Sequence, residues 1–234
     1  MKALLLAAGL GTRLRPITDR MPKCLVPIRG KPLLEYWLDL LLPGGIERIL
    51  VNTHHLAPLM EAFVQRSRWR ERLDTTYEPE LLGTGGTILA NRAYFAGEAF
   101  LVGHADNLTL FDVAEFLACH RERPSGVAIT MMTFVTDAPR TCGIIVQDRD
   151  GIVREFHEKV ENPPGNLANG AVYVIEPEVV EYIASLGGPF IDFSTAVLPE
   201  FLGRIRTFNG VKYHRDIGNP ESLRIAEEEY LWEA

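Results

Sequence analysis

Residues 3–23 read ALLLAAGLGTRLRPITDRMPK, an apolar run that leads into a glycine-containing basic loop. The apolar residues 3–8 have the length of a buried strand, and Gly9 and Gly11 follow at once. Glycine permits positive φ and brings backbone N–H groups close to a ligand, so such a turn can hold an anion. The loop also carries three cations, Arg13, Arg15 and Lys23. This stretch therefore predicts a strand followed by a phosphate-binding loop.

Two common phosphate-binding motifs do not fit this loop. A dinucleotide-binding fingerprint has a third glycine where Leu14 stands, and it opens a long helix, which Pro16 and Pro22 prevent. A P-loop has Gly-Lys-Ser/Thr after four spacer residues, and that tripeptide is absent. A glycine-rich turn with surface arginines is the plain structural alternative.

The composition is that of a globular protein. The chain has 234 residues, of which 47% are hydrophobic, which suits one large α/β domain and argues against disorder. A formal net charge of -7 argues against general nucleic-acid binding. Three cysteines without C-x-x-C spacing indicate a reducing compartment and no zinc site. No stretch has membrane-spanning length, so we expect a cytoplasmic protein with no nucleic-acid or membrane partner. A homo-oligomer is compatible with this composition.

Strand and helix patterns alternate along the first half of the chain, and the second half is richer in strands. The expected strands are residues 3–8, 48–53, 74–78, 100–103, 127–135, 143–157 around a turn at 148–151, and 170–175. The expected helices are residues 33–42, 57–65, 85–95, 177–185, 194–202 and 220–232. This order predicts an α/β fold with a Rossmann-like mixed, mainly parallel sheet and helices on both faces.

The loop pattern G-x-G-T-R-L-x-P, with Lys23 ten residues after Arg13, resembles the N-terminal motif of the sugar-1-phosphate nucleotidyltransferases, including mannose- and heptose-1-phosphate guanylyltransferases. The resemblance covers nearly the whole chain. It implies a nucleotidyltransferase (GT-A-like) fold in one domain, residues 1–234, with a nucleotide-binding lobe at about 1–110 and a sugar-phosphate-binding lobe at about 111–234. It also implies an enzyme that joins a nucleoside triphosphate to a sugar 1-phosphate and releases pyrophosphate. A non-catalytic sugar-nucleotide-binding regulatory protein on the same fold is the alternative.

The resemblance implies a set of site residues for the nucleotide and the metal. The nucleotide-binding residues would be Ala7, Ala8, Gly9, Gly11, Thr12, Arg13, Lys23, Glu78, Gly83, Thr84 and Asp106. Arg13 and Lys23 would be the catalytic cations, and Lys23, as a loop lysine, is expected to contribute little to the core. Asp106 and Asp216 would hold Mg²⁺, which takes one or two carboxylates together with water and substrate phosphates.

Four residues of the second half resemble the part of the family motif that binds the sugar phosphate. They are Gly143, Glu158, Lys159 and Asn169. A solvated ion pair in a turn explains Glu158 and Lys159 equally well. The chain departs from the family pattern at Val160, where a proline is usual, at Cys142 and His214, where aromatic residues are common, and at Gly170 and Ala171, which are exchanged.

Glu78 stands where thymidylyl- and uridylyltransferases of the family commonly have Gln. A carboxylate only accepts hydrogen bonds, and guanine offers two adjacent donors. We therefore expect GTP with a mannose- or heptose-type 1-phosphate, and UTP or dTTP as the alternative. Glu80 could take the place of Glu78, and a surface Glu with no contact to the base is the plain alternative.

Overall fold

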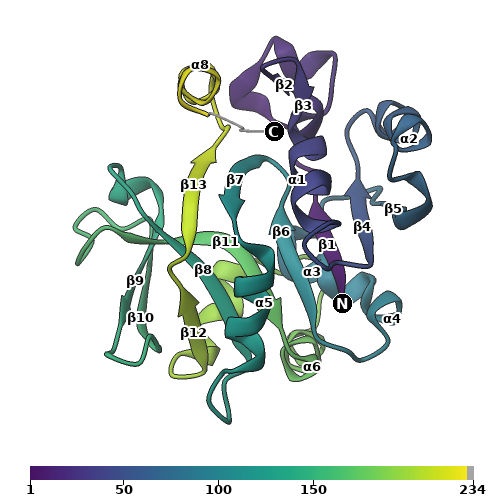
Figure 1. Cartoon of the computed structure of the whole chain (residues 1–234). Helices are drawn as coiled ribbons and strands as arrows, with labels where there is room; N and C mark the ends of the chain where they lie inside the picture. The colour runs from purple at the N-terminus through teal and green to yellow at the C-terminus, as the bar shows by residue number, and fades with distance from the viewer. Residues whose placement is uncertain (231–234) are drawn as a thin grey trace. The chain divides into compact units, whose positions relative to one another are not determined.

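Residues 1–230, which the computed structural model describes, divide into two units (Figure 1). Unit 1 comprises Met1–Leu81, Gly103–Phe111 and the described residues from Lys212 onward. Unit 2 comprises Leu82–Val102 and Asp112–Val211. The chain thus changes unit repeatedly rather than once near residue 110. Leu82–Val102 lies in unit 2 although it belongs to the first half of the sequence, and the described residues from Lys212 onward lie in unit 1 although they belong to the second half.

A parallel sheet forms the centre of unit 1. Strand β1 (Lys2–Leu6) pairs with β4 (Arg48–Thr53), which pairs with β5 (Leu73–Tyr77), both in parallel. The register places Leu6 beside Asn52 and Asn52 beside Thr76. The carboxyl ends of these strands, where ligands bind in open α/β sheets, therefore lie at one edge.

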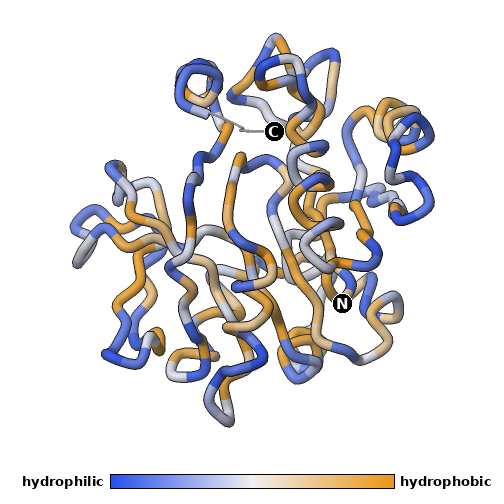
Figure 2. The backbone as a smooth tube through the Cα atoms, in the orientation of Figure 1, coloured by the Kyte–Doolittle hydropathy of each residue, from blue (hydrophilic) through white to orange (hydrophobic). Residues whose placement is uncertain are grey.

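Helices and short strands complete unit 1. They are β2 (Pro27–Ile28), β3 (Lys31–Pro32), α1 (Leu33–Leu41), α2 (Ala57–Arg66), η4 (Arg70–Arg72), β7 (Asn107–Phe111), β13 (Val211–Asp216, whose first residue belongs to unit 2) and α8 (Pro220–Glu229). Most of α1 is apolar, as its colour in Figure 2 shows. A buried cluster joins Leu14 of the basic loop to Leu33 of α1, Leu108 of β7 and Ile217, so the loop is anchored in the core.

Antiparallel pairing dominates unit 2. Strand β9 (Gly143–Gln147) pairs with β10 (Val153–Glu158), and β11 (Leu167–Ile175) pairs with β8 (Ile129–Val135) and with β9. Strand β12 (Ile205–Phe208) runs parallel to β8, and β6 (Phe100–His104) begins in unit 2 and ends in unit 1. The helices of unit 2 are α3 (Gly83–Ala90), α4 (Arg92–Phe95), α5 (Val113–Arg121), α6 (Pro177–Leu186) and α7 (Phe193–Ala196), with η5 (Pro139–Thr141) and η6 (Leu198–Phe201).

Two expected helices are each divided in the structure. The helix expected over 85–95 is two helices, because the Asn91 side chain donates to the Thr87 carbonyl and ends α3. The helix expected over 194–202 is α7 followed by η6, because Pro199 has no N–H to continue an α-helix. The last helix ends at Glu229, and Trp232 of its expected range lies outside the described residues.

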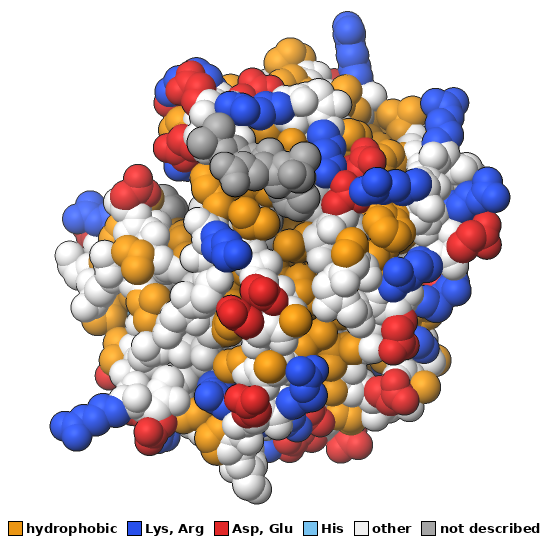
Figure 3. All heavy atoms as spheres, in the orientation of Figure 1, with side chains coloured by type: hydrophobic (Ala, Val, Ile, Leu, Met, Phe, Trp, Pro, Cys, Tyr) orange, Lys and Arg blue, Asp and Glu red, His pale blue; other side chains and the backbone are white. Residues whose placement is uncertain are grey.

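Several elements were not expected from the sequence, namely the β2–β3 hairpin, β7, α5, β12 and β13. A capping signal for α5 is nevertheless present, since the Asp112 side chain accepts a hydrogen bond from the Glu115 N–H at 3.0 Å. Among residues 1–230, no helix is both long and apolar enough to cross a membrane. Figure 3 shows acidic and basic side chains interspersed on the face in view.

Candidate active site

The loop after β1 is folded into short 3-10 turns. They are η1 (Thr12–Leu14), η2 (Ile17–Asp19) and η3 (Lys23–Leu25). Gly11 has φ of 61°, and a Cβ there would lie 2.8 Å from Thr18 Cγ2. The Thr18 hydroxyl donates to the Gly11 carbonyl at 2.8 Å, which closes the loop on itself. Glycine is therefore required at position 11 by the packing of the loop as well as by its backbone.

Lys23 lies between two carboxylates. Its ammonium Nζ is 2.7 Å from Asp106 Oδ2 and 3.1 Å from Asp216 Oδ1, and only 7% of its side chain is exposed. Burial lowers the pKa of Lys23, but the two carboxylates outweigh this and raise it above the usual value. Burial likewise raises the pKa of Asp106, and Lys23 and His104 bring it below the usual value. Lys23 and Asp106 are therefore both charged at neutral pH, and the expectation that Lys23 matters little to the core is wrong.

The two acids come from distant parts of the sequence. Asp106 lies in the two-residue turn between β6 and β7, and Asp216 is the last residue of β13. The Ile217 N–H donates to the Asp106 carbonyl at 3.3 Å, which holds the two segments together. A Cβ on Gly218 would lie 2.7 Å from Asp216 Oδ2 and 2.9 Å from Arg13 Nη2, so a side chain at this position would displace these two charged groups.

Arg13 completes the charged group in unit 1. Its Nη2 is 3.7 Å from Asp216 Oδ2, and 71% of its side chain is exposed. Asp106, Asp216, Lys23 and Arg13 thus form one cluster of alternating charge beside the glycine-containing loop. Within residues 1–230, no group of three or more His, Cys, Asp and Glu side chains is placed to hold a metal ion. The two carboxylates do converge on one cation, and their oxygens are the donors that Mg²⁺ prefers.

Glu78 is buried, with 3% of the residue exposed, so it is not the surface Glu of the plain alternative. Its Oε1 accepts from Asn52 Nδ2 at 3.0 Å, and the Asn52 Oδ1 accepts from the Ala7 N–H at 2.6 Å. Asn52 was not predicted from the sequence as a site residue. The one local signal is that Asn52 is the only amide side chain of β4 and directly follows the apolar run 49–51.

Gly83 and Thr84 lie in unit 2, at the start of α3. Gly83 has φ of 69°, and a Cβ there would lie 2.7 Å from the Ile191 carbonyl oxygen. The Gly85 and Gly86 N–H groups donate to that same carbonyl at 2.9 and 3.4 Å. Close packing against the segment around Ile191 explains these glycines, and a role of Gly83 and Thr84 in binding a nucleotide stays a prediction.

Unit 2 places three of the four predicted sugar-phosphate residues on neighbouring strands, and Lys159 directly follows one of these strands. Glu158 of β10 pairs with Gly143 of β9, and β9 in turn pairs with β11, which carries Asn169. The Lys159 ammonium is 3.0 Å from Glu158 Oε1. Asn169 Nδ2 donates to the buried Tyr173 hydroxyl at 2.6 Å, and Asn169 Oδ1 accepts from the Ala171 N–H at 2.9 Å. These bonds hold the Asn169 amide in one orientation.

Comparison with known protein families shows which family the chain belongs to. The model of the family described as Nucleotidyl transferase matches residues 2–233. The chain belongs to this family.

Similar proteins within the nucleotidyl transferase family act on different bases, to judge from their names. A UTP–glucose-1-phosphate uridylyltransferase of Synechocystis is 33% identical over 199 residues, 79% of this chain and 51% of that protein. A mannose-1-phosphate guanylyltransferase of Mycobacterium tuberculosis is 32% identical over 226 residues, 94% of this chain and 62% of that protein. This chain thus spans about half to three-fifths of the length of these relatives.

A solved structure agrees over the full length. The crystal structure of HddC from Yersinia pseudotuberculosis matches with a TM-score of 0.82 and 26% identity, covering 98% of this chain and 99% of that one. HddC is also known in a complex with GMP-PN. The predicted family and the predicted mixed, mainly parallel α/β fold with helices are both confirmed.

The departures from the family pattern have local structural correlates. Lys159 has φ of 49°, and a proline after it would restrict it to extended conformations, so Val160 is compatible with this turn. Cys142 Sγ lies 3.7 Å from the hydroxyls of Thr136 and Thr141. His214 of unit 1 is partly buried, and this burial lowers the pKa of its ring to about 4, so the ring is neutral at pH 7.

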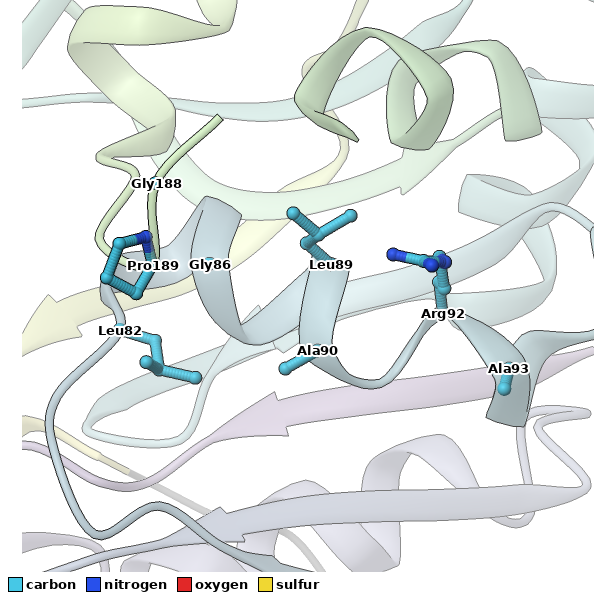
Figure 4. A pocket seen from close by; sticks show the side chains of 8 residues that line it. All are labelled: Leu82, Gly86, Leu89, Ala90, Arg92, Ala93, Gly188 and Pro189. Carbon is cyan, nitrogen blue, oxygen red and sulfur yellow. The ribbon is translucent and has the colours of Figure 1, made fainter. Parts of the chain in front are cut away.

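Unit 2 also contains a hollow of about 350 Å³ (Figure 4). It is lined by Leu82, Gly86 and Leu89 of the α3 segment, by Arg92, and by the turn at Gly188 and Pro189. None of the four predicted sugar-phosphate residues lines it. The predicted site residues therefore lie outside the lining of this hollow.

Proposed function

We infer that this chain transfers a nucleotidyl group from a nucleoside triphosphate, with GTP favoured, to a mannose- or heptose-type sugar 1-phosphate. The products would be the nucleoside diphosphate sugar and pyrophosphate. The observation that carries the proposal is the placement of the buried Lys23 ammonium between Asp106 and Asp216, beside the glycine loop. Such a cluster suits a reaction in which charge on phosphate groups must be held and neutralised.

The reaction needs no side-chain base. A sugar phosphate has a second pKa near 6 and is largely dianionic at neutral pH. Its oxygen would attack the α-phosphorus in line, forming one P–O bond while the bond from that phosphorus to the oxygen bridging to the β-phosphorus breaks and pyrophosphate leaves. Arg13 and the loop amides would hold the leaving pyrophosphate, and Lys23 would contact the α-phosphate. Glu158, Lys159 and Asn169 of unit 2 would bind the sugar phosphate.

Asp106 and Asp216 would hold Mg²⁺. Both carboxylates reach one cation, and 54% of the Asp216 side chain is exposed, which leaves access for water and phosphate oxygens. Bound there, Mg²⁺ would neutralise charge on the triphosphate. Lys23 would then contact the α-phosphate, since the nucleotide supplies anionic oxygens that can replace the carboxylates as its partners.

Glu78 supports guanine as the base, because a carboxylate can accept from the two adjacent guanine donors. The guanylyltransferase relative and the GMP-PN complex of HddC agree with this choice. Uridylyl transfer is the second candidate, favoured by the uridylyltransferase relative at 33% identity.

The two acids provide the test of this proposal. Asp106→Asn and Asp216→Asn should each lower the rate of pyrophosphate release from GTP and mannose 1-phosphate on the order of 10²–10³-fold. The double variant should lose little more than either single one, because both acids serve one metal–phosphate unit. Asp150→Asn, at an exposed turn of unit 2, is the matched control. Full activity of either variant, or of the wild type in excess chelator, would contradict the proposed roles.

A further inference from the structure

Asn52 occupies the middle of the parallel sheet at its ligand edge. It pairs with Leu6, the last residue of β1, and with Thr76 of β5, and it is 2% exposed. The chain after β1 forms the phosphate loop, and the chain after β5 leads to Glu78. A buried amide at this point is costly unless it is hydrogen-bonded, so the partners of Asn52 bear on its role.

The orientation of the Asn52 amide is determined by its neighbours. The Ala7 backbone N–H can only donate, so the atom 2.6 Å from it must be the carbonyl oxygen Oδ1. The amino group Nδ2 must then face Glu78 Oε1, at 3.0 Å. The usual ambiguity between the oxygen and the nitrogen of an amide does not arise here.

The backbone of Glu78 is held as firmly as its side chain. The Glu78 N–H donates to the Thr53 carbonyl at 2.8 Å, and the His54 ring Nδ1 lies 2.7 Å from the Glu78 carbonyl. The Glu78 side chain therefore extends from a backbone held by hydrogen bonds, and its Oε1 is held by the Asn52 amino group. Residue 78 must present an acceptor to Asn52, whichever residue stands there.

We propose that Asn52 is a positioning residue for base preference. By holding one hydrogen-bonding atom of the side chain of residue 78 toward β4, it fixes which other atom of that side chain is presented to the base. The inference rests on the proposed function, in which residue 78 contacts the base. With Glu at position 78 an acceptor is presented in either orientation. With Gln, the oxygen would turn to Asn52 and the amino group would be presented, which suits uracil better than guanine.

Four proteins test this inference, namely wild type, Glu78→Gln, Asn52→Asp and the double variant. An aspartate at position 52 keeps the acceptor for the Ala7 N–H but has no donor for residue 78. In the double variant this aspartate would accept from the amino group of the glutamine at position 78, so that the glutamine presents its oxygen. The double variant thus has the same residue type at position 78 as Glu78→Gln, in the opposite orientation.

The readout is the ratio of kcat/KM for GTP to that for UTP with one sugar 1-phosphate, together with the ratio of the two dissociation constants without sugar phosphate. A ratio within one protein does not depend on the folded fraction, so a destabilised variant remains informative. We expect Glu78→Gln to lower the ratio at least about tenfold and the double variant to recover at least about fivefold of that loss, the scale of one hydrogen bond to a charged or buried group. Asn52→Asp alone should weaken both nucleotides, because two carboxylates then face each other.

Two results would overturn the inference. One is an equal ratio in Glu78→Gln and the double variant, which would mean that Asn52 does not set the orientation. The other is an unchanged ratio in all four proteins, which would mean that residue 78 does not face the base. A wild type that binds GTP and UTP but releases no pyrophosphate would contradict the proposed function instead, and the binding ratios would still decide the role of Asn52.

Discussion

Ala171 has the left-handed backbone conformation that glycine adopts most readily, with φ of 54°. It lies where the pairing of β11 with β8 shifts register between Asn169 and Tyr173, and where the family pattern has glycine. An L-residue pays about 1–2 kcal/mol in this region. We expect Ala171→Gly to raise the free energy of unfolding by about 1 kcal/mol in urea denaturation, after the entropy cost of glycine is subtracted.

Gly170 provides the matched control for this substitution. A Cβ there would lie 2.5 Å from Met132 Cε and 3.0 Å from the Met132 carbonyl oxygen. Gly170→Ala should therefore lower the free energy of unfolding by about 1–3 kcal/mol through overpacking. Equal effects of the two substitutions would contradict this explanation of why the two residues are exchanged.

Lys23→Met keeps the bulk of the side chain and removes its charge. It should lower kcat on the order of 10²–10³-fold, the usual effect of losing one preorganised charge contact. It should also lower the free energy of unfolding at pH 7 by about 1–3 kcal/mol, less than for a fully buried pair because Asp216 is half exposed. Adding Asp216→Asn should return part of that stability, since one of the two facing carboxylates is neutralised. Chemical denaturation of the single and double variants measures this, and a Lys23→Met protein as stable as wild type would contradict it.

At the scale of elements, Asp39 connects α1 to the segment after α2. Its carboxylate is 2.6 Å from Lys31 Nζ and 2.5 Å from Arg68 Nη2, and it accepts from Trp69 Nε1 at 2.8 Å. Burial raises the pKa of Asp39, but these three donors outweigh it and bring the pKa below the usual value. The stability that Asp39 contributes is therefore present above the unfolded pKa of about 3.9 and is lost as the pH falls through the folded pKa.

Asp39→Asn tests this contribution. At pH 7 the variant should be about 1–3 kcal/mol less stable than wild type, the scale of hydrogen bonds to a charged group. The difference should shrink as the pH falls below about 4, because wild-type Asp39 is then protonated as well. Urea denaturation at a series of pH values from neutral to acidic follows it. A difference that is constant with pH would show that the Asp39 charge is not involved.

The elements that the sequence predicted well are those whose pattern is local. Residues 48–53 are a strand in both the prediction and the structure, because a short apolar run with β-branched residues is typical of a buried strand. The division of residues 85–95 depends on one side-chain bond from Asn91, and β13 depends on pairing with β7 far away in the sequence. Asn52 was missed for the same reason, since its importance comes from Ala7 and Glu78, which pairing of distant strands brings to it.

At the scale of the whole molecule, the proposal assigns the triphosphate group to unit 1 and the sugar phosphate to unit 2. Arg13→Ala in unit 1 should raise KM for GTP about tenfold and leave KM for the sugar phosphate within about twofold, since a charge-assisted bond is worth about 1.5–3 kcal/mol. Lys159→Ala in unit 2 should do the reverse. Steady-state kinetics with each substrate varied in turn measures both values. A rise in the same KM for both variants would contradict the assignment.

Catalysis of nucleotidyl transfer by this chain is decided by measuring pyrophosphate release. GTP, UTP, dTTP, ATP and CTP are each mixed with Mg²⁺ and mannose 1-phosphate, and pyrophosphate and nucleotide sugar are measured together. We expect equal amounts of both products, the highest kcat/KM with GTP, and no pyrophosphate when the sugar phosphate is omitted. Binding of nucleotides without pyrophosphate from any of these triphosphates, with mannose, heptose or glucose 1-phosphate, would contradict the proposed activity and leave a non-catalytic sugar-nucleotide-binding protein.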